Sequence, residues 1–423
     1  MRWFLTFIAL LAVVGPTPTR GTAQGQIEIL SSTAENRFPS GIAFRIDALS
    51  TTTLETLSLT YKIGEEQSTT VPVSFEPGRH IEAEYVLGDK EQGTYLHADA
   101  EIGYHWSIAD ANGEELHTSA ATVTYKDTRF DWQETASHGI TLFWYKSSQA
   151  FADERLQIGV ADLQRSSRLL GIAEDLTVKV LVYSSMADMV EALPWKNRTP
   201  EPRLPTLGLQ VSPKTVLLLG NHPNVARTLA HELSHIAVRQ GVGYIPSWLD
   251  EGLALLAEDG LAPEHAAALE RAIKGDKVLH LRDMTEVPDP REHHEVWLYY
   301  GQAYSVARFM IASHGEDDLR TLMALLKRGE AFDDALLQVY SRDTDGLESE
   351  WRESTGLPRS RLDELTAVPG TSRKPTSTLA QQFTAYAILA GFSLGCLFLF
   401  PFTTLWLVVA AAFIYRQKHR PLA

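Results

Sequence analysis

The chain has 423 residues, which is enough for two or three domains with ordinary hydrophobic cores. Hydrophobic residues make up 44% and charged residues 22%, as in globular proteins, and the net charge of −15 argues against a nucleic-acid partner, which would require a basic face. The single cysteine, Cys396, excludes a framework of disulfides within one chain.

The N-terminus has the pattern of a cleaved secretory signal. Met1 and Arg2 precede an apolar run over residues 3–14, which is too short to cross a bilayer core ~30 Å thick. Small residues follow at Gly21 and Ala23, as is typical near a cleavage site. We therefore predict a signal peptide over residues 1–23, and the alternative is an uncleaved N-terminal anchor.

Residues 24–125 are predicted to form a β-sandwich domain. Turn signals separate several short runs that are rich in β-branched and aromatic residues, and no cluster of histidines or acids here indicates chemistry. One such signal, Asp110-Ala111-Asn112-Gly113, is typical of a hairpin. The candidate strands cover residues 26–30, 41–49, 54–63, 71–75, 80–87, 95–108 and 121–125.

From about residue 126 the pattern becomes a mixture of strands and helices. Strands are predicted at residues 177–183 and 215–220. Helices are predicted at residues 147–170, 185–193, 225–240, 248–258, 263–273 and 296–313, with a last helical region from 317 to about 364. Strands followed mostly by helices predict an α+β domain over residues 126–366.

The C-terminal part has the pattern of a membrane anchor. A polar, proline-containing linker over residues 367–382 leads to an uncharged apolar stretch over 383–415, which exceeds the ~20 residues that one transmembrane helix requires. Arg416, Lys418 and Arg420 follow directly, and the positive-inside rule predicts that this tail, residues 416–423, is cytoplasmic. With an exported N-terminus, we predict a single-pass protein of the cell membrane whose folded domains are extracytoplasmic.

Residues 231–235 read His-Glu-Leu-Ser-His inside a segment with apolar helical periodicity. Positions four apart lie on one face of a helix, so His231 and His235 can reach one metal ion while Glu232 points beside it. Zinc accepts imidazole nitrogen, and a catalytic zinc keeps one position open for a water whose pKa it lowers. The pattern therefore predicts one Zn²⁺, with Glu232 as the catalytic residue that takes the proton of this water.

A third ligand is needed, and the next helical segment offers one. Residues 246–254 read Pro-Ser-Trp-Leu-Asp-Glu-Gly-Leu-Ala, after a helix break at Gly241 and Gly243. We predict that Glu251 is the third metal ligand. Asp250 is predicted to cap the helix or to accept a hydrogen bond from a ligating histidine. The alternative for both acids is a favourable interaction with the helix dipole.

These two motifs together resemble the gluzincins, specifically the peptidase MA-like family, and are similar to the aminopeptidases that include leukotriene A4 hydrolase. The resemblance covers about residues 177–351 and implies a thermolysin-like, mostly helical domain with one zinc held by His, His and Glu. The spacing from His235 to Glu251 is slightly shorter than in those aminopeptidases, and their upstream Gly-Ala-Met-Glu-Asn motif is absent.

The resemblance extends to residues 300–309, Tyr-Gly-Gln-Ala-Tyr-Ser-Val-Ala-Arg-Phe. It implies that Tyr300 is catalytic and stabilises the oxyanion of the tetrahedral intermediate, with Tyr304 one turn further as the alternative. A plain role in helix packing is also open for both tyrosines. The resemblance also implies an edge strand that pairs with the extended substrate, and we expect residues 215–220 to be the strand nearest the site.

The remaining histidines carry less information. His138, His265, His280 and His314 show no ligand spacing. His293 and His294 are predicted to lie in a loop over residues 288–295, which could cover a cleft or bind product, and solvated loop residues are the alternative.

Together these patterns predict a membrane-anchored, extracytoplasmic zinc metallopeptidase that hydrolyses peptide bonds of a peptide or protein substrate through a zinc-bound water activated by Glu232. The alternative is a cell-surface binding or scaffold protein whose zinc site is not catalytic.

Overall fold

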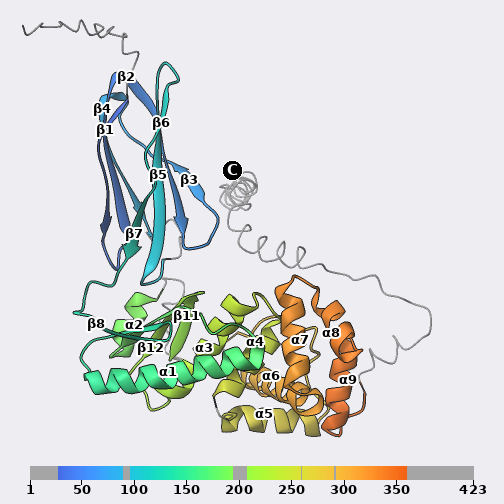
Figure 1. The fold of residues 1–423 in the computed structure, drawn as a ribbon. Helices are drawn as coiled ribbons and strands as arrows, with labels where there is room; N and C mark the ends of the chain where they lie inside the picture. Colours follow the sequence, from blue (N-terminus) through green and yellow to red (C-terminus); the bar gives the residue numbers. More distant parts are fainter. Residues whose placement is uncertain (1–26, 89–95, 194–206, 259, 290–291, 360–423) are drawn as a thin grey trace, which may run out of the picture. The chain divides into compact units, whose positions relative to one another are not determined.

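The computed structural model describes residues 27–88, 96–193, 207–258, 260–289 and 292–359 (Figure 1). The predicted signal peptide (1–23), linker (367–382), membrane span (383–415) and cytoplasmic tail (416–423) lie outside these ranges. Within the described ranges, no helix is both long enough and apolar enough to cross a membrane.

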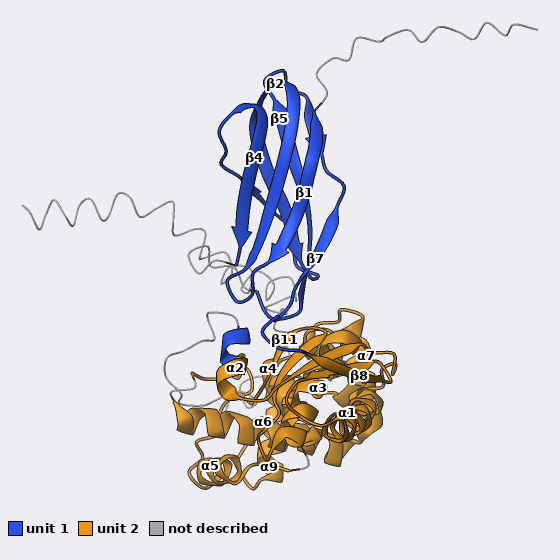
Figure 2. Cartoon of the chain, turned by 90° about the vertical axis from the view of Figure 1, so that its left-hand side faces the viewer, with its two compact units in different colours: residues 1–131, 190–199 blue, residues 132–189, 200–423 orange. Residues whose placement is uncertain are grey.

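The chain divides into two compact units, each with its own hydrophobic core (Figure 2). The first unit extends to Asp131 and includes residues 190–199, and the second comprises residues 132–189 and the chain from residue 200 onwards. The first is built of strands and the second is rich in helices, so the β-rich N-terminal part and the α+β character predicted for the chain are confirmed.

Seven strands joined by hydrogen bonds form the first unit. They are β1 (Glu28–Asn36), β2 (Ile42–Ile63), β3 (Thr69–Pro72), β4 (Gly78–Leu87), β5 (Ala100–Asp110), β6 (Glu115–His117) and β7 (Ala121–Tyr125). The long strand β2 pairs antiparallel with β1, β3, β4 and β5, and β5 also pairs with β6 and β7.

Strand β2 replaces two shorter strands that the sequence predicts at residues 41–49 and 54–63. Its first half pairs with β1 and β4, and its second half pairs with β3 and β5, with register shifts between the halves. The rings of Phe44 and Tyr104 have centroids 4.7 Å apart, and those of Tyr61 and Tyr85 are 6.4 Å apart. The strands paired with the two halves of β2 therefore pack face to face around one core, with β2 running through both layers.

The predicted hairpin signal lies between β5 and β6. The Oδ1 atom of Asp110 accepts hydrogen bonds from the backbone N–H groups of Asn112 and Glu114, at 2.9 and 3.0 Å. Gly113 has a φ of 79°, in the left-handed region that favours glycine. The hairpin prediction is thus confirmed, and it includes the short strand β6 that the sequence pattern misses.

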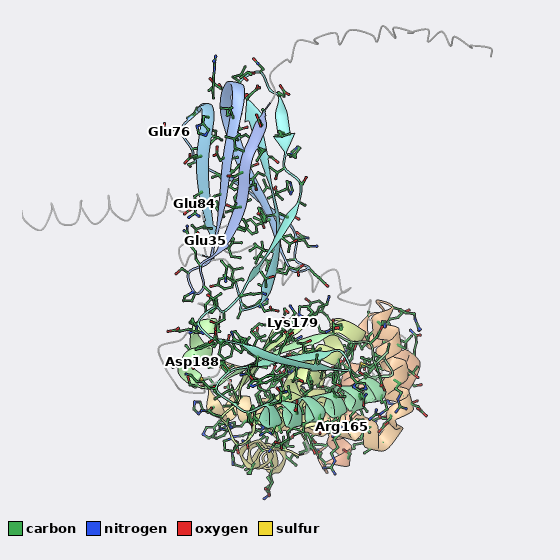
Figure 3. The ribbon with its side chains drawn as sticks, turned by 60° about the vertical axis from the view of Figure 1, so that its left-hand side comes forward. Glu35, Glu76, Glu84, Arg165, Lys179 and Asp188 are labelled. Atoms are coloured by element: carbon green, nitrogen blue, oxygen red, sulfur yellow. The ribbon has the colours of Figure 1, made fainter. Side chains whose placement is uncertain are left out.

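A network of ion pairs covers part of the outer face of the first unit. Glu35 on β1 and Glu84 on β4 (Figure 3) both pair with Arg45 of β2, at 2.9 and 2.6 Å. Arg37 joins the same two carboxylates, at 3.1 and 3.0 Å. Exposed pairs of this kind contribute little to stability, so the network indicates a solvated face rather than a source of folding free energy.

A five-stranded sheet lies at the start of the second unit, in the order β11-β12-β10-β9-β8. The strands are β8 (Gln133–Ser137), β9 (Ile140–Trp144), β10 (Val178–Tyr183), β11 (Gly208–Ser212) and β12 (Thr215–Leu219). Strands β9, β10 and β12 run parallel, and β8 and β11 are antiparallel edge strands. Strands β10 and β12 confirm the prediction, while β8, β9 and β11 are additional.

Nine helices lie in the described residues, all within the second unit except the end of α2, which falls in the first. The two long helices α1 and α3 meet strand β9 at Gly159, where a Cβ atom would lie 3.3 Å from Leu229 and 3.5 Å from Ile140. The helices are α1 (Gln149–Leu170), α2 (Met186–Ala192), α3 (Val225–Gly241), α4 (Ser247–Ala257), α5 (Pro263–Lys274), α6 (His293–His314), α7 (Glu316–Lys327), α8 (Phe332–Tyr340) and α9 (Thr344–Ser354).

Helices α4 and α6 approach closely at Gly252. A Cβ atom at this position would lie 2.5 Å from the carbonyl oxygen of Ala303 and 2.8 Å from the Cβ of Ala307. Only glycine allows the two backbones to come this near. The contact fixes the position of the neighbouring residue, Glu251, relative to the turn of α6 that carries Tyr300.

Candidate metal centre

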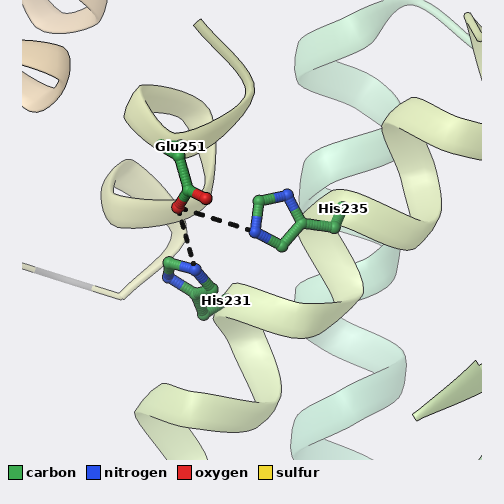
Figure 4. Close-up of side chains that lie close together, drawn as sticks. All are labelled: His231, His235 and Glu251. Atoms are coloured by element: carbon green, nitrogen blue, oxygen red, sulfur yellow. Dashed lines mark ion pairs between the residues drawn. The ribbon is translucent and has the colours of Figure 1, made fainter. Parts of the chain in front are cut away.

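Helix α3 presents His231 and His235 on one face (Figure 4). Their rings have centroids 4.8 Å apart and are nearly perpendicular, at 78°. The opposite side of the helix buries Leu229, Leu233 and Ile236 in the core, so the apolar periodicity fixes the direction of both imidazoles. The two residues are brought together as their spacing predicts.

The Glu251 carboxylate, on helix α4, points between the two imidazoles (Figure 4). Its Oε2 atom lies 3.4 Å from Nε2 of His231 and 3.8 Å from Nε2 of His235. Two ligands at ~2.0–2.1 Å from a tetrahedral zinc are separated by roughly 3.3–3.4 Å, so these three atoms can surround one ion after a small closure. The three residues form a group that could hold a metal.

The Oε2 atom of Glu251 is buried and accepts no hydrogen bond from the described residues. A buried carboxylate oxygen without a donor is costly, because its lost hydration is not replaced. A cation in the space that it shares with the two Nε2 atoms would remove this cost. The donor set, two imidazoles and one carboxylate, is a typical one for catalytic zinc, so the residues fit the ion that the sequence predicts.

Two further carboxylates orient the imidazoles. Oδ1 of Asp250 lies 2.9 Å from Nδ1 of His235, and Oε1 of Glu258 lies 2.7 Å from Nδ1 of His231. An ionised carboxylate only accepts hydrogen bonds, so each Nδ1 is a donor and each Nε2 is the nitrogen left for a metal. Asp250 makes the contact that an orienting partner of a ligand requires.

Glu258 was not found by sequence reasoning. Glu258 follows Glu251 by two helical turns, so the two residues lie on the same side of α4. This spacing is the only feature of the sequence that indicates a role for Glu258 at the metal centre. Arg227, one turn before His231 on α3, donates to Glu258 at 2.9 Å and to the carbonyl oxygen of Gly260 at 2.8 Å. The guanidinium therefore holds this carboxylate beside the imidazole.

Glu232 is only 8% exposed and lies beside the ligand cluster. Burial raises the pKa of its carboxyl, while the charges of His231 and His235 act in the opposite direction. The backbone N–H of Gln210, on the edge strand β11, donates to its Oε2 atom at 2.9 Å. A carboxylate with a raised pKa next to a metal cluster is suited to accept a proton.

Strand β11 reaches Glu232 because residue 208 is a glycine. A Cβ atom there would lie 2.6 Å from Cγ2 of Thr228 and 3.0 Å from Cγ of Glu232. Neither Gly208 nor Gln210 was singled out from the sequence, because the short strand lacks a clear alternation of polar and apolar residues. The expectation that residues 215–220 form the strand nearest the site is wrong: β12 is an interior strand and buried throughout, and the edge strand β11 makes the contact with Glu232.

The carboxylates around the two histidines favour the protonated imidazoles when no metal is bound. Burial lowers the pKa of His231, but the nearby carboxylates of Glu251 and Glu258 outweigh burial and leave the pKa well above the ordinary value. The pKa of His235 is also raised, because Asp250 and Glu251 outweigh the effect of burial. The same interactions lower the pKa of Glu251 against the effect of burial. A metal ion must therefore displace protons when it binds.

Tyr300 lies on α6 near these carboxylates. Burial raises the pKa of its phenol, and the negative charges of Glu251 and Glu232 raise it further, so the hydroxyl stays protonated and can donate. Tyr299 instead donates to Oγ of Ser247 at 2.9 Å and is buried, which indicates a structural role. Tyr304 is half-buried one turn further along α6.

His293 and His294 begin helix α6, so the prediction of a loop over residues 288–295 is wrong at this end. Both imidazoles pack against Trp297, with ring centroids 6.0 and 5.3 Å away. The helix therefore begins three residues before Val296, where the apolar periodicity of the sequence starts. Neither histidine belongs to the ligand cluster described above.

The sequence model of one protein family, the peptidase MA superfamily, matches residues 161–356 of the chain. This range includes all three predicted ligands, Glu232 and Tyr300. No curated protein matches the sequence.

Several solved structures are similar to the chain. The M1 zinc metallopeptidase from Deinococcus radiodurans covers 79% of this chain and 92% of its own, with 12% identity and a TM-score of 0.35. A mutant of a two-domain M1 zinc metallopeptidase bound to L-arginine covers 76% and 90%, with 10% identity and a TM-score of 0.37. The β-1,3-glucanase of family GH64 from Paenibacillus barengoltzii covers 30% of this chain and 29% of its own, with 16% identity and a TM-score of 0.16.

Proposed function

We infer that this chain, a zinc metallopeptidase that belongs to the peptidase MA superfamily, hydrolyses peptide bonds with Glu232 as the proton acceptor. The observation that carries the inference is the convergence of Nε2 of His231, Nε2 of His235 and Oε2 of Glu251, with Glu232 adjacent. This Oε2 atom is buried and accepts no hydrogen bond from the described residues. A purely structural zinc site is closed by four protein ligands, whereas three ligands leave a position for water and substrate.

One Zn²⁺ is the proposed cofactor, held by His231, His235 and Glu251. Asp250 and Glu258 fix the orientation of the imidazoles through their Nδ1 atoms. When bound, zinc supplies Lewis acidity, which makes a water more acidic and polarises the carbonyl of the scissile bond.

Glu232 and Tyr300 perform the proton and charge chemistry in this proposal. The Glu232 carboxylate takes the proton of the attacking water and passes it to the leaving amine, and its raised pKa matches this role. The protonated phenol of Tyr300 donates to the oxyanion of the tetrahedral intermediate. Tyr304 is the alternative donor.

The edge strand β11 is proposed to bind the extended backbone of the substrate. It pairs with β12 on one side only, and Gln210 directs its N–H away from β12 toward Glu232. An extended peptide can add to such an edge through main-chain hydrogen bonds, which suits a peptide or protein substrate.

We also propose that the enzyme is a single-pass protein of the cell membrane with its catalytic unit extracytoplasmic. Support comes from the signal-like residues 1–23, the uncharged apolar stretch 383–415 and the basic tail 416–423. Carbonate extraction of membranes and protease treatment of intact cells test this placement. Release of the full chain by carbonate, or protection of the catalytic unit in intact cells, contradicts it.

The decisive experiment on activity is Glu232→Gln in the full chain, with Glu270→Gln as the matched control on an exposed surface. Loss of the proton acceptor is expected to lower kcat for a peptide library by about 10²–10⁴-fold while one zinc per chain remains bound. Zinc binding without any cleavage by the unchanged protein would favour the alternative, a binding or scaffold protein with a non-catalytic zinc site.

A further inference from the structure

His265 lies on helix α5, outside the ligand set, and its ring stacks on the ring of Tyr300 (centroids 5.3 Å apart, interplanar angle 28°). We propose that His265 is a positioning residue that holds the Tyr300 phenol toward the metal centre. The inference rests on the proposed function in one respect, because it takes Tyr300 to be the oxyanion donor.

The backbones of α5 and α6 meet at this contact. A Cβ atom on Gly301 would lie 2.5 Å from the carbonyl oxygen of His265 and 3.1 Å from the Cβ of Leu269. Glycine at 301 therefore lets α5 come close enough for the imidazole to cover the face of the residue just before it, Tyr300. The stack follows from how the two helices are packed and does not depend on a flexible surface contact.

The imidazole is held without a hydrogen bond at Nδ1. This atom is buried and has no partner among the described residues. Burial also lowers the pKa of His265, although the charges of Glu264 and Glu258 act in the opposite direction. A neutral ring with an unpartnered nitrogen contributes its flat apolar surface, and a planar ring without that nitrogen should serve equally well.

Residues of the metal centre act electrostatically on both His265 and Tyr300. Glu258 and His231 both influence its pKa, and the phenol that it covers is influenced by Glu251 and Glu232. The stacked imidazole and phenol therefore both lie near the residues that hold and orient the first ligand. Removing it would leave a cavity into which the phenol could turn.

The test compares His265→Ala with His265→Phe in the full chain. His265→Ala is expected to lower kcat roughly tenfold, which is less than the ~10²–10³-fold that loss of an oxyanion donor causes, with KM and zinc content unchanged. His265→Phe should restore kcat, because it keeps the stacked ring. In a Tyr300→Phe background, His265→Ala should cause no further loss, because the two residues act through one group.

Leu269→Ala is the control for general loosening of α5, since it shortens a side chain one turn further along the same helix. An equal loss of kcat in this variant, or additive losses for His265→Ala and Tyr300→Phe, would overturn the positioning role.

A spectroscopic measurement separates this inference from the proposed function. In protein labelled with 3-fluorotyrosine, the ¹⁹F resonance of Tyr300 is assigned by its loss in Tyr300→Phe. His265→Ala should shift or broaden this resonance, and His265→Phe and Leu269→Ala should leave it nearly unchanged. If Tyr300→Phe retains full activity, the oxyanion role fails, while the resonance still decides whether His265 positions the ring. An unchanged resonance in His265→Ala overturns the inference.

Discussion

The carboxylate of Glu258 lies 2.7 Å from Nδ1 of His231, so a residue two turns beyond Glu251 orients the first ligand of the metal centre. The contact crosses from the end of α4 to the middle of α3. It fixes the imidazole with Nε2 toward Glu251, and it makes the geometry of the centre depend on how the two helices pack.

Glu258→Gln is expected to weaken zinc binding about 10–100-fold, because the neutral amide no longer holds Nδ1–H in place by a charge-assisted hydrogen bond. Competition with a chromophoric chelator measures the change. Asp250→Asn should have an effect of the same order through His235. Unchanged zinc affinity in both variants would show that the two carboxylates do not support the ligands.

Gly208→Ala is expected to reduce kcat/KM at least tenfold while zinc stays bound. The new Cβ would lie 2.6 Å from Thr228 and 3.0 Å from the Cγ of Glu232, so strand β11 must move away from the helix. Steady-state kinetics with a peptide substrate, together with metal analysis, check this. Wild-type kinetics would place the substrate elsewhere than beside β11.

Gly252→Ala is expected to destabilise the second unit by roughly 1–3 kcal/mol, because a Cβ cannot fit 2.5 Å from the carbonyl oxygen of Ala303. Thermal unfolding of the metal-free protein measures the loss. Gly103→Ala in β5 is the control, since a Cβ there meets no atom within 4 Å. Equal stability of the two variants would contradict the close packing of α4 on α6.

Zinc binding should release protons, and its apparent affinity should rise with pH. In the metal-free protein the pKa values of His231 and His235 are raised above the ordinary 6.5 by the neighbouring carboxylates, so a metal competes with protons for their Nε2 atoms. We expect Kd to fall as the pH rises through 6.5 and to keep falling above it. Calorimetry in buffers of different ionisation enthalpy counts the protons, and release of none would contradict the arrangement.

The sequence predicts the centre well where the chemistry lies within one helix. The spacing of His231 and His235, with apolar residues on the opposite face, is enough to place both imidazoles together. The helix break and the acidic residues after it were enough to predict Glu251, on the next helix, as the third metal ligand. Continuous apolar periodicity likewise predicted α1, α3 and α4 to within a few residues.

Features that depend on how elements pack could not be predicted in this way. Glu258 reaches His231 because of the way in which helix α4 packs against helix α3. His265 covers Tyr300 because Gly301 allows helices α5 and α6 to pack closely. Strand β11 is short and partly exposed, so its sequence shows no pattern of apolar residues that distinguishes it from a loop. The continuity of β2 was hidden by the polar residues in its middle, where its partners change.

The most direct test of the central claim is anomalous diffraction at the zinc edge from crystals of the zinc-loaded protein. One anomalous peak is expected between Nε2 of His231, Nε2 of His235 and Oε2 of Glu251, at ~2.0–2.2 Å from each, with Glu232 beside it and not bound to it. No peak at this point, or a zinc ion coordinated by Glu232 in place of Glu251, would contradict the account.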